Sequence, residues 1–276
     1  MKKTPYSEFV RQLREKGEYR TAPENRRMPP RKQSAWISFR YFLCNMYMLG
    51  SCSFRNVLRR FDHDYWANTT WHSLLFPEQM GSEVIVTGFQ NRNAYSGPVV
   101  YLCNHMSTLE TMALPPMLIP FGKISIILKK SIDQIPFIGS AMRTVGDIAV
   151  TRTNPREDLK TVFREGCDRI SRDYSIVIFP QGTRSAVFDR HHFSSLGVKL
   201  AEKAKVPVIP IACQTDFLAK GKPGMFEDFG AVDPSKPIRF ACGPVLPPEL
   251  GAKTMQERSI EFIAGKLTEW GLAVTS

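Results

Sequence analysis

The chain has 276 residues, of which 43% are hydrophobic and 23% are charged. This composition suits one large globular domain or a domain with an appendage, and it excludes a disordered polyelectrolyte, a collagen-like chain and a small disulfide-rich fold. The six cysteines are scattered and form no Cys-x-x-Cys pair, and no apolar stretch follows the first lysines. We therefore expect reduced thiols, a cytosolic location and no signal peptide.

The net charge of +11 is concentrated in the first 60 residues. Residues 1–60 hold 14 Lys and Arg against 4 Asp and Glu, whereas residues 61–276 hold 23 against 22. A basic arm of this kind can meet nucleic acid, an anionic membrane surface or an acidic protein, or it can serve only to keep the chain in solution.

Within the arm, residues 34–50 form the most apolar stretch and carry a single charged side chain, Arg40. The stretch is short for crossing a hydrocarbon layer, which takes roughly 20 residues. Basic residues flank it on both sides, at Arg26, Arg27, Arg31, Lys32, Arg55, Arg59 and Arg60. A helix lying in the membrane interface, with its cations on lipid phosphates, fits these flanks better than a membrane span. A helix that packs on the body of the protein is the alternative.

The aromatic side chains of residues 34–50 form one block rather than a series of spaced stacking platforms, so we expect no nucleic-acid partner. The sequence therefore predicts a basic, aromatic-rich helical arm over residues 1–69. We expect this arm to dock peripherally on a phospholipid membrane, at its inner, cytoplasmic face.

After the arm, apolar runs rich in β-branched residues alternate with helical patterns. Strands are predicted at residues 83–89, 97–104, 123–128, 147–152, 175–180, 206–213 and 237–243. Helices are predicted at residues 107–118, 136–146, 154–173, 194–205 and 254–270. Strands separated by helices indicate an α/β sheet covered by helices, here over residues 70–276. In such sheets, ligand-binding groups gather just past the strand ends.

The first polar cluster, residues 104–110, follows the predicted strand at 97–104. A histidine that leaves a strand can hydrogen-bond across the turn to a carboxylate five residues later. Glu110 would then orient the imidazole of His105 and stabilise its cation, while the other ring nitrogen takes a proton from a substrate hydroxyl. For these two residues alone, a purely structural pair is the alternative.

The second cluster, residues 179–185, follows the strand at 175–180. Its glycine turn exposes backbone N–H groups beside a hydroxyl and a guanidinium, a combination that binds oxyanions or phosphate. Arg184 offers a planar fork that can bind phosphate through two hydrogen bonds. A third cluster has Arg152 at the end of the strand at 147–152, with Gly146 before it. A solvated turn and a surface charge are the alternatives for these two clusters.

Taken in this order, the clusters resemble the glycerolipid acyltransferase family, typified by 1-acylglycerol-3-phosphate (lysophosphatidic acid) acyltransferases. The family has four ordered blocks, N-H-x-x-x-x-D/E, G-x-I-x-V-x-R, F-P-E-G-T-R-S and V-P-V-x-P-V/I, with a K-K…I-P-F-x-G connector after the first. The matching residues are Asn104, His105 and Glu110; Gly146, Ile148, Val150 and Arg152; Phe179, Pro180, Gly182, Thr183, Arg184 and Ser185; Val206, Pro207, Val208, Pro210 and Ile211; and, in the connector, Lys129, Lys130, Ile135, Pro136, Phe137 and Gly139. The resemblance covers residues 84–245 and implies a mixed, mostly parallel α/β sheet flanked by helices, of the glycerol-3-phosphate acyltransferase type.

The resemblance also implies an acyltransferase of phospholipid biosynthesis. His105 would be the general base on a glycerol hydroxyl and Glu110 its orienting partner. The alkoxide would attack the thioester of acyl-CoA or acyl-carrier protein, with no metal and no further cofactor, because a thioester is already activated. The expected acceptor is 1-acylglycerol 3-phosphate, which gives phosphatidic acid. The residues expected to bind it are Gly182, Thr183, Arg184, Arg152, Lys129 and Gln181.

Two departures from the family blocks bear on the acceptor. Gln181 stands where the family has glutamate, so a charged contact becomes a neutral hydrogen bond, and we expect retained activity with altered acceptor affinity. The segment at residues 191–197 lacks the lysines that often precede the family's glycine. A lysoglycolipid or lyso-aminolipid is therefore an alternative acceptor. The alternative to an enzyme is a membrane protein that binds lipid without turnover.

Two further candidates are weighed against structural roles. Cys103 lies on an apolar strand, where a buried thiol acts as a small hydrophobe rather than as a nucleophile. His191 and His192 with Asp189 could hold a metal ion, but adjacent side chains point apart and no further ligand cluster accompanies them. We expect neither a cysteine nucleophile nor a metal site.

Overall fold

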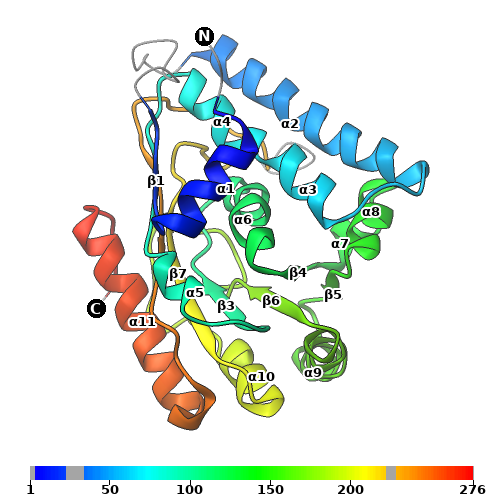
Figure 1. Ribbon diagram of the computed structural model, residues 1–276, viewed down its shortest axis with the longest axis vertical. Helices are drawn as coiled ribbons and strands as arrows, with labels where there is room; N and C mark the ends of the chain where they lie inside the picture. The colour runs from blue at the N-terminus through cyan, green and yellow to red at the C-terminus, as the bar shows by residue number, and fades with distance from the viewer. Residues whose placement is uncertain (1–3, 23–33, 222–227, 276) are drawn as a thin grey trace.

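The computed structural model describes residues 4–22, 34–221 and 228–275. In these ranges, eight strands form one sheet in the order β1–β2–β8–β7–β3–β6–β4–β5 (Figure 1). The strands are β1 (Tyr19–Arg20), β2 (Val84–Thr87), β3 (Val100–Cys103), β4 (Lys123–Lys129), β5 (Ile148–Val150), β6 (Tyr174–Ile178), β7 (Val208–Gln214) and β8 (Ile238–Cys242). Strand β1 runs antiparallel to β2 and β8 runs antiparallel to β7, whereas the other neighbouring pairs are parallel. The predicted mixed, mostly parallel α/β sheet is confirmed.

Helices cover both faces of the sheet (Figure 1). One face carries α9 (Pro155–Ser171), α10 (Leu196–Ala204) and α11 (Gly251–Glu269). The other face carries α1 (Tyr6–Glu15), α2 (Ala35–Val57), α3 (His63–Thr70), α4 (His72–Gln79) and α6 (Leu109–Leu118). Shorter helical segments are α5 (Gln90–Asn93), η2 (Ile119–Phe121), α7 (Lys130–Asp133), α8 (Ile138–Thr144) and η3 (Pro248–Leu250).

Strand β3 shows why the sheet has two cores. All four of its residues are buried, as expected for a central strand covered on both sides. Because successive side chains point to opposite faces, Tyr101 and Cys103 join the core under α6, whereas Val100 and Leu102 join the core under α10. The predicted strand at 97–104 thus forms at the centre of the sheet, although β7 and β8 separate it from β2.

Helix α9 begins as its sequence predicts. The side chain of Asn154 accepts a hydrogen bond from the Glu157 N–H at 3.3 Å, and a proline occupies the first helical position. The buried positions Val162, Gly166 and Ile170 recur every four residues and face the sheet. This helix therefore holds the preceding turn, which includes Arg152, against the end of β5.

Residues 4–22 belong to the body of the protein, which the sequence patterns did not indicate. Phe9 and Leu13 on α1 are fully buried in the core of the α6 face, and the Phe9 ring stacks on Trp71 at 4.3 Å between centroids. Tyr19 pairs with Val86, which adds β1 to the edge of the sheet. The predicted division between an arm over residues 1–69 and a domain over 70–276 therefore crosses a shared hydrophobic core.

The predicted helix at residues 34–50 forms and continues to Val57 as α2. One of its faces packs on the body through buried side chains that include Ile37, Tyr41 and Met48. The opposite face leaves large apolar side chains in solvent, among them Phe39 and Phe54 at 50% and 67% exposure. The flanking cations at residues 26–32 lie outside the described residues. None of the helices in the described ranges combines the length and the hydropathy that a membrane crossing requires.

The burial of Phe9 predicts a large cost for its truncation. Phe9→Ala removes a fully buried ring and should lower the free energy of unfolding by about 3–5 kcal/mol. Phe39→Ala removes the same group from an exposed position and should change it by less than about 0.5 kcal/mol. Urea unfolding of both variants measures the difference, and equal small effects would show that α1 does not belong to the cooperative core.

Candidate active site

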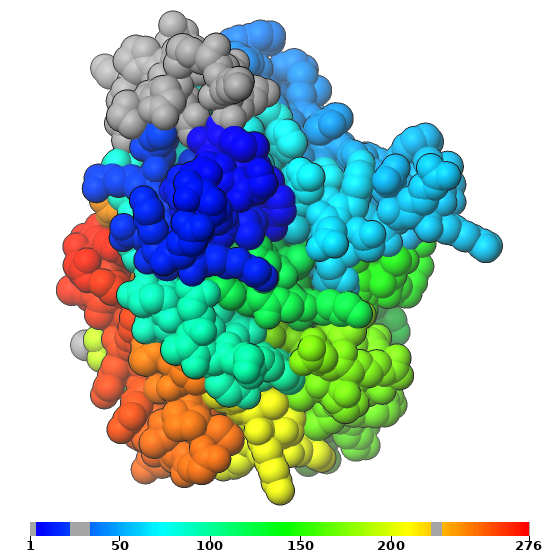
Figure 2. All heavy atoms as spheres, in the orientation of Figure 1, coloured from blue at the N-terminus to red at the C-terminus, as the bar shows by residue number. Residues whose placement is uncertain are grey.

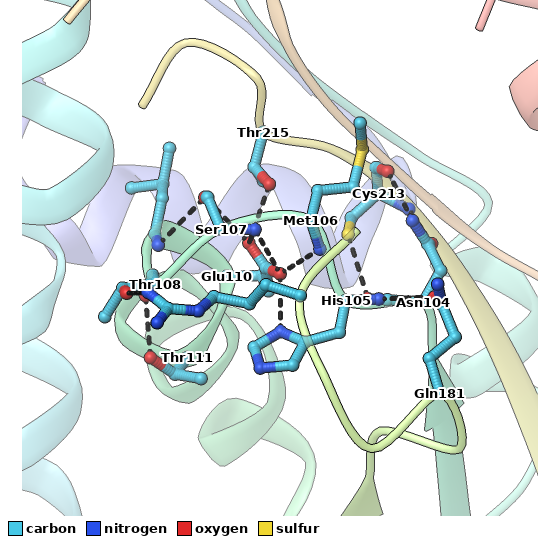
Figure 3. Close-up of polar contacts among 12 residues, drawn as sticks. Asn104, His105, Met106, Ser107, Thr108, Glu110, Thr111, Gln181, Cys213 and Thr215 are labelled. Atoms are coloured by element: carbon cyan, nitrogen blue, oxygen red, sulfur yellow. Dashed lines mark hydrogen bonds and ion pairs between the residues drawn. The ribbon is translucent and has the colours of Figure 1, made fainter. Parts of the chain in front are cut away.

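The predicted site residues lie at the carboxyl ends of three neighbouring parallel strands. The turn after β3 carries residues 104–110, the turn after β6 carries residues 179–185, and Thr215 follows β7 directly. Because β7, β3 and β6 are adjacent in the sheet and parallel, their carboxyl ends meet at one edge. Figure 3 shows the polar side chains from these turns converging on Glu110 and His105.

Asn104 anchors the start of the first turn to β7. Its side-chain oxygen accepts a hydrogen bond from the Cys213 N–H at 2.7 Å, and its side-chain nitrogen donates to the Cys213 carbonyl at 2.9 Å. The side chain thus takes the place of a backbone rung beyond the last residue of β3. The chain leaves the sheet at His105 from a fixed point.

His105 meets Glu110 in the geometry that the spacing predicts. His105 Nδ1 lies 2.8 Å from Glu110 Oε1, which requires a proton on Nδ1 when the carboxyl is ionised. The imidazole stacks on Phe179 with 4.3 Å between ring centroids, and its side chain is 11% exposed. Glu110 and Phe179 therefore orient the imidazole, and Nε2 is left without a hydrogen-bond partner in the described part of the chain.

Glu110 is a fully buried carboxylate surrounded by donors. Oε1 accepts from the backbone N–H groups of Met106 at 2.6 Å and Ser107 at 2.9 Å, besides His105. Oε2 accepts from the hydroxyls of Ser107 at 3.0 Å and Thr215 at 2.6 Å. Burial alone would raise the pKa of this carboxyl, but the contacts with His105 and Thr215 outweigh burial and hold the pKa below its usual value.

The turn after β6 holds the backbone of His105 from both sides. Gln181 Oε1 accepts from the His105 N–H at 2.8 Å, and the Ser185 N–H donates to the His105 carbonyl at 2.9 Å. Gly182, at φ +70°, supplies the left-handed residue that reverses the chain between them. Gln181 therefore supports the histidine turn through its amide oxygen.

Two arginines meet on this turn. Arg184 donates from Nη1 to the Thr108 hydroxyl at 2.7 Å and forms an ion pair with Asp228 at 2.6 Å. Arg152 donates to the Gly182 carbonyl, and its backbone N–H is held by Asp158 of α9 at 2.7 Å. Partial desolvation and the charge of Arg184 lower the pKa of the Arg152 guanidinium, against the charge of Asp158. The two cations thus lie close enough to favour an anion between or beside them.

Two other predicted binding residues, Thr183 and Lys129, are less closely connected to the rest of the site. Thr183 is exposed on the turn after β6, and Lys129 is exposed at the end of β4. In the described ranges, no hydrogen bond or ion pair joins either side chain to His105, Arg152 or Arg184. Their predicted roles in acceptor binding stay predictions.

The sequence pointed to neither Thr215 nor Asp228, and it gave Thr108 no role of its own within the first cluster. Thr215 is the first hydroxyl after the apolar strand β7, a position that could have drawn attention beside the two clusters at neighbouring strand ends. Thr108 lies inside the first block at a position where the family pattern has no requirement. Asp228 lies in a long connection between β7 and β8, where no local pattern marks a functional residue.

Cys103 and His192, the candidates for a nucleophile and a metal ligand, have surroundings typical of structural residues. Cys103 is fully buried, and burial raises the pKa of its thiol. His192 Nδ1 lies 2.5 Å from Asp189 on an exposed surface. Over residues 4–22, 34–221 and 228–275, no three His, Cys, Asp or Glu side chains are grouped as they would be to hold a metal ion.

The part of the chain that carries these turns resembles known proteins. The model of the acyltransferase family matches residues 83–214. The 1-acyl-sn-glycerol-3-phosphate acyltransferase of Pseudomonas aeruginosa is 36% identical over 115 residues, which are 42% of this chain and 44% of that protein. The enzyme of the same name from Chlamydomonas reinhardtii is 30% identical over 158 residues, which are 57% of this chain and 44% of that protein. This chain therefore covers less than half the length of these two relatives.

A solved structure shares the fold. The crystal structure of the 1-acyl-sn-glycerophosphate acyltransferase from Thermotoga maritima superposes with a TM-score of 0.61 over 86% of this chain and 95% of that one. The two sequences are 16% identical in this alignment. At that identity the likeness concerns the arrangement of strands and helices.

The contact between Thr215 and Glu110 predicts a pH-dependent loss of stability. Thr215→Val removes a hydrogen bond to a buried charge and should lower the free energy of unfolding by about 1.5–3 kcal/mol at neutral pH. Because the folded-state pKa of Glu110 is depressed, the stability that its donors supply is lost as the pH falls through that pKa. The difference between wild type and variant should therefore shrink in acid. Urea unfolding from neutral to acid pH tests this. Thr215→Ser, which keeps the hydroxyl, should match wild type, and a valine effect independent of pH would contradict the assignment.

Proposed function

We propose that this chain, whose residues 83–214 match the model of the acyltransferase family, transfers a fatty acyl group from a thioester to the free hydroxyl of 1-acylglycerol 3-phosphate, giving phosphatidic acid. The observation that carries this proposal is the oriented His105–Glu110 pair on the turn that Arg184 also contacts. A base and an anion-binding guanidinium on adjoining turns fit a substrate that carries a hydroxyl and a phosphate on one glycerol unit.

In the proposed reaction, His105 is the general base. Nε2 accepts the proton of the glycerol hydroxyl while the oxygen attacks the thioester carbonyl carbon, and the positive charge on the ring is stabilised by Glu110. The tetrahedral intermediate then expels the thiolate, which takes the proton back from Nε2. An ester and a free thiol are formed, and His105 returns to its starting state.

The acceptor's phosphate is assigned to the guanidinium groups on the turn after β6. Arg184 would bind phosphate oxygens through its planar fork, and Arg152, tied to the Gly182 carbonyl, would add a second cation. Gly182, Thr183, Gln181 and Lys129 complete the proposed binding set. The amide of Gln181 holds the His105 backbone. The difference from the family's glutamate at this position therefore affects the position of the base as well as the binding of the acceptor.

The acyl donor is proposed to be acyl-CoA or acyl-carrier protein. Since the thioester is already activated toward attack by an alkoxide, the proposed step uses this co-substrate and no further cofactor. The donor's acyl chain and the acceptor are both lipids, which links the site to a membrane.

The membrane contact is proposed for the exposed face of α2. Its large apolar side chains recur at helical spacing opposite the buried face: Trp36, Phe39, Leu43, Tyr47, Phe54 and Val57. In Figure 2 the end of this segment projects at the edge of the molecule. Ile135 and Phe137 are also exposed and lie just before α8, which packs against α2. An apolar face beside Arg55, Arg59 and Arg60 suits the interface of an anionic phospholipid layer.

The proposed function predicts a defined product and a defined loss. Full-length protein supplied with long-chain acyl-CoA and a mixture of lysolipids should release free thiol and form phosphatidate, identified by mass spectrometry. His105→Ala should lower kcat by about 10²–10⁴-fold, because the base is lost. His192→Ala, an exposed histidine outside the site, is the matched control and should keep full activity. Acylation of another lysolipid instead would show that the proposed acceptor is wrong. Binding without any product would favour a lipid-binding protein.

The membrane proposal predicts that charge on α2 abolishes docking. Phe39→Glu and Phe54→Glu together should weaken binding to anionic phospholipid vesicles by about 100-fold or more, since each aromatic side chain that enters the lipid contributes about 1.5–3 kcal/mol. Leu159→Glu places the same charge at an exposed apolar position of α9 and should leave pelleting unchanged. Truncation of residues 1–60 is unsuitable, because it removes Phe9 and Leu13 from the core. Equal pelleting of all variants would refute docking through α2.

A further inference from the structure

The guanidinium assigned to the acceptor's phosphate already holds a carboxylate. Arg184 Nη1 lies 2.6 Å from Asp228 Oδ1, and the Thr108 hydroxyl, which accepts a hydrogen bond from Arg184, also donates to Asp228 at 3.2 Å. The three side chains form a closed triangle at the rim of the site. Arg184 is largely buried at 16% exposure, whereas Asp228 is 50% exposed.

We propose that Asp228 holds the place of the acceptor's phosphate on Arg184, so that acceptor binding displaces it and its return helps to expel the product. This inference rests on the proposed function, in which Arg184 binds the phosphate. Carboxylate and phosphate oxygens both fit the planar fork of an arginine, so one excludes the other from the same N–H groups.

The fold presents Asp228 to Arg184 from a segment that is anchored beside it. Phe229 meets the ring of Phe42 on α2 edge-on, with 5.3 Å between centroids. The Val232 N–H donates to the Ser38 hydroxyl of α2 at 3.0 Å. These contacts fix the backbone after Asp228 while its side chain stays half exposed. The carboxylate can therefore swing into solvent without opening the core.

A competing carboxylate has a use in this reaction because substrate and product share one headgroup. Lysophosphatidate and phosphatidate both carry the phosphate that Arg184 would bind, so tight binding of the first also traps the second. An intramolecular anion lowers the apparent affinity for both by the same factor. The cost falls on acceptor KM, and the gain is faster release of product.

The like charges of Asp228 and a bound phosphate favour competition between them for Arg184 rather than binding of both together. A phosphate bound beside an ionised Asp228 would meet a like charge within contact distance, which is unfavourable. If Asp228 only stabilised the fold, its ion pair would persist when an anion binds elsewhere. The two roles differ in one measurable quantity, the dependence of anion affinity on Asp228 in the presence and absence of Arg184.

The test is a double-mutant cycle read by calorimetry with glycerol 3-phosphate as the headgroup probe. Full-length wild type, Asp228→Asn, Arg184→Gln and the double variant are titrated. We expect Asp228→Asn to tighten the probe about 3- to 10-fold when Arg184 is present and to leave its residual affinity unchanged in the Arg184→Gln background. Asp228→Ser should act in the same direction. Asp216→Asn removes the same charge from a carboxylate that pairs with Lys236 instead, and should have no effect.

Three results would overturn the placeholder: no tightening in Asp228→Asn, equal tightening in both backgrounds, or no probe binding to any of the four proteins. Thermal melting confirms that each variant is folded. The binding cycle needs no turnover, so it separates this inference from the proposed function. Tightening without acyl transfer would keep the placeholder and reject the reaction, whereas acyl transfer without coupling would do the opposite. In active protein, Asp228→Asn should lower acceptor KM and strengthen inhibition by phosphatidate.

Discussion

The buried carboxylate of Glu110 is the constraint on which the rest of the site depends. An ionised carboxylate without solvent is stable only when donors satisfy its oxygens. Here the donors come from the turn after β3, from the imidazole of His105 and from Thr215 after β7. Each donor requires its own element to be in place. One charge therefore fixes the turn, the strand end and the ring at the same time.

This constraint explains why the imidazole has a single orientation. Glu110 binds Nδ1, Phe179 packs on the ring face, and Gln181 and Ser185 hold the backbone from which the ring projects. The ring is thus restrained through its edge, its face and its main chain. A base restrained in this way loses little conformational freedom when a hydroxyl approaches Nε2, which is where the proposed reaction gains from preorganisation.

The sequence predicted the parts of this arrangement that are local. Apolar runs rich in β-branched residues located the central strands, and helical periodicity located the flanking helices. The order of the polar turns placed His105, Glu110 and Arg184 near one sheet edge. Strand β1 was not predictable, because two residues carry no periodicity and their pairing depends on packing of Phe9 and Tyr19. The direction of β8 was equally hidden, since an apolar strand looks the same in either orientation.

The site residues that were missed share a physical reason. Thr215 and Asp228 act through contacts between turns that are distant in sequence: Thr215 lies 105 residues from Glu110, and Asp228 lies 120 residues from Thr108. A hydroxyl or a carboxylate on a connection is common, and only the fold shows what it faces. His105 and Glu110, by contrast, lie on one turn, so their spacing alone implied the contact.

Helix α2 borders both the surface proposed for the membrane and the candidate site. Its exposed face is the surface proposed for the lipid layer, and its inner side contacts Phe229 and Val232, which follow the carboxylate on Arg184 in the chain. In the proposed reaction, the lysolipid would have its acyl chain in the membrane and its phosphate at the guanidinium. A helix that borders both places can set the distance between them. If α2 lies in the interface, the height of Arg184 above the lipid is fixed by the packing of α2 on the body, and the headgroup reaches the site while the chain stays in an apolar environment.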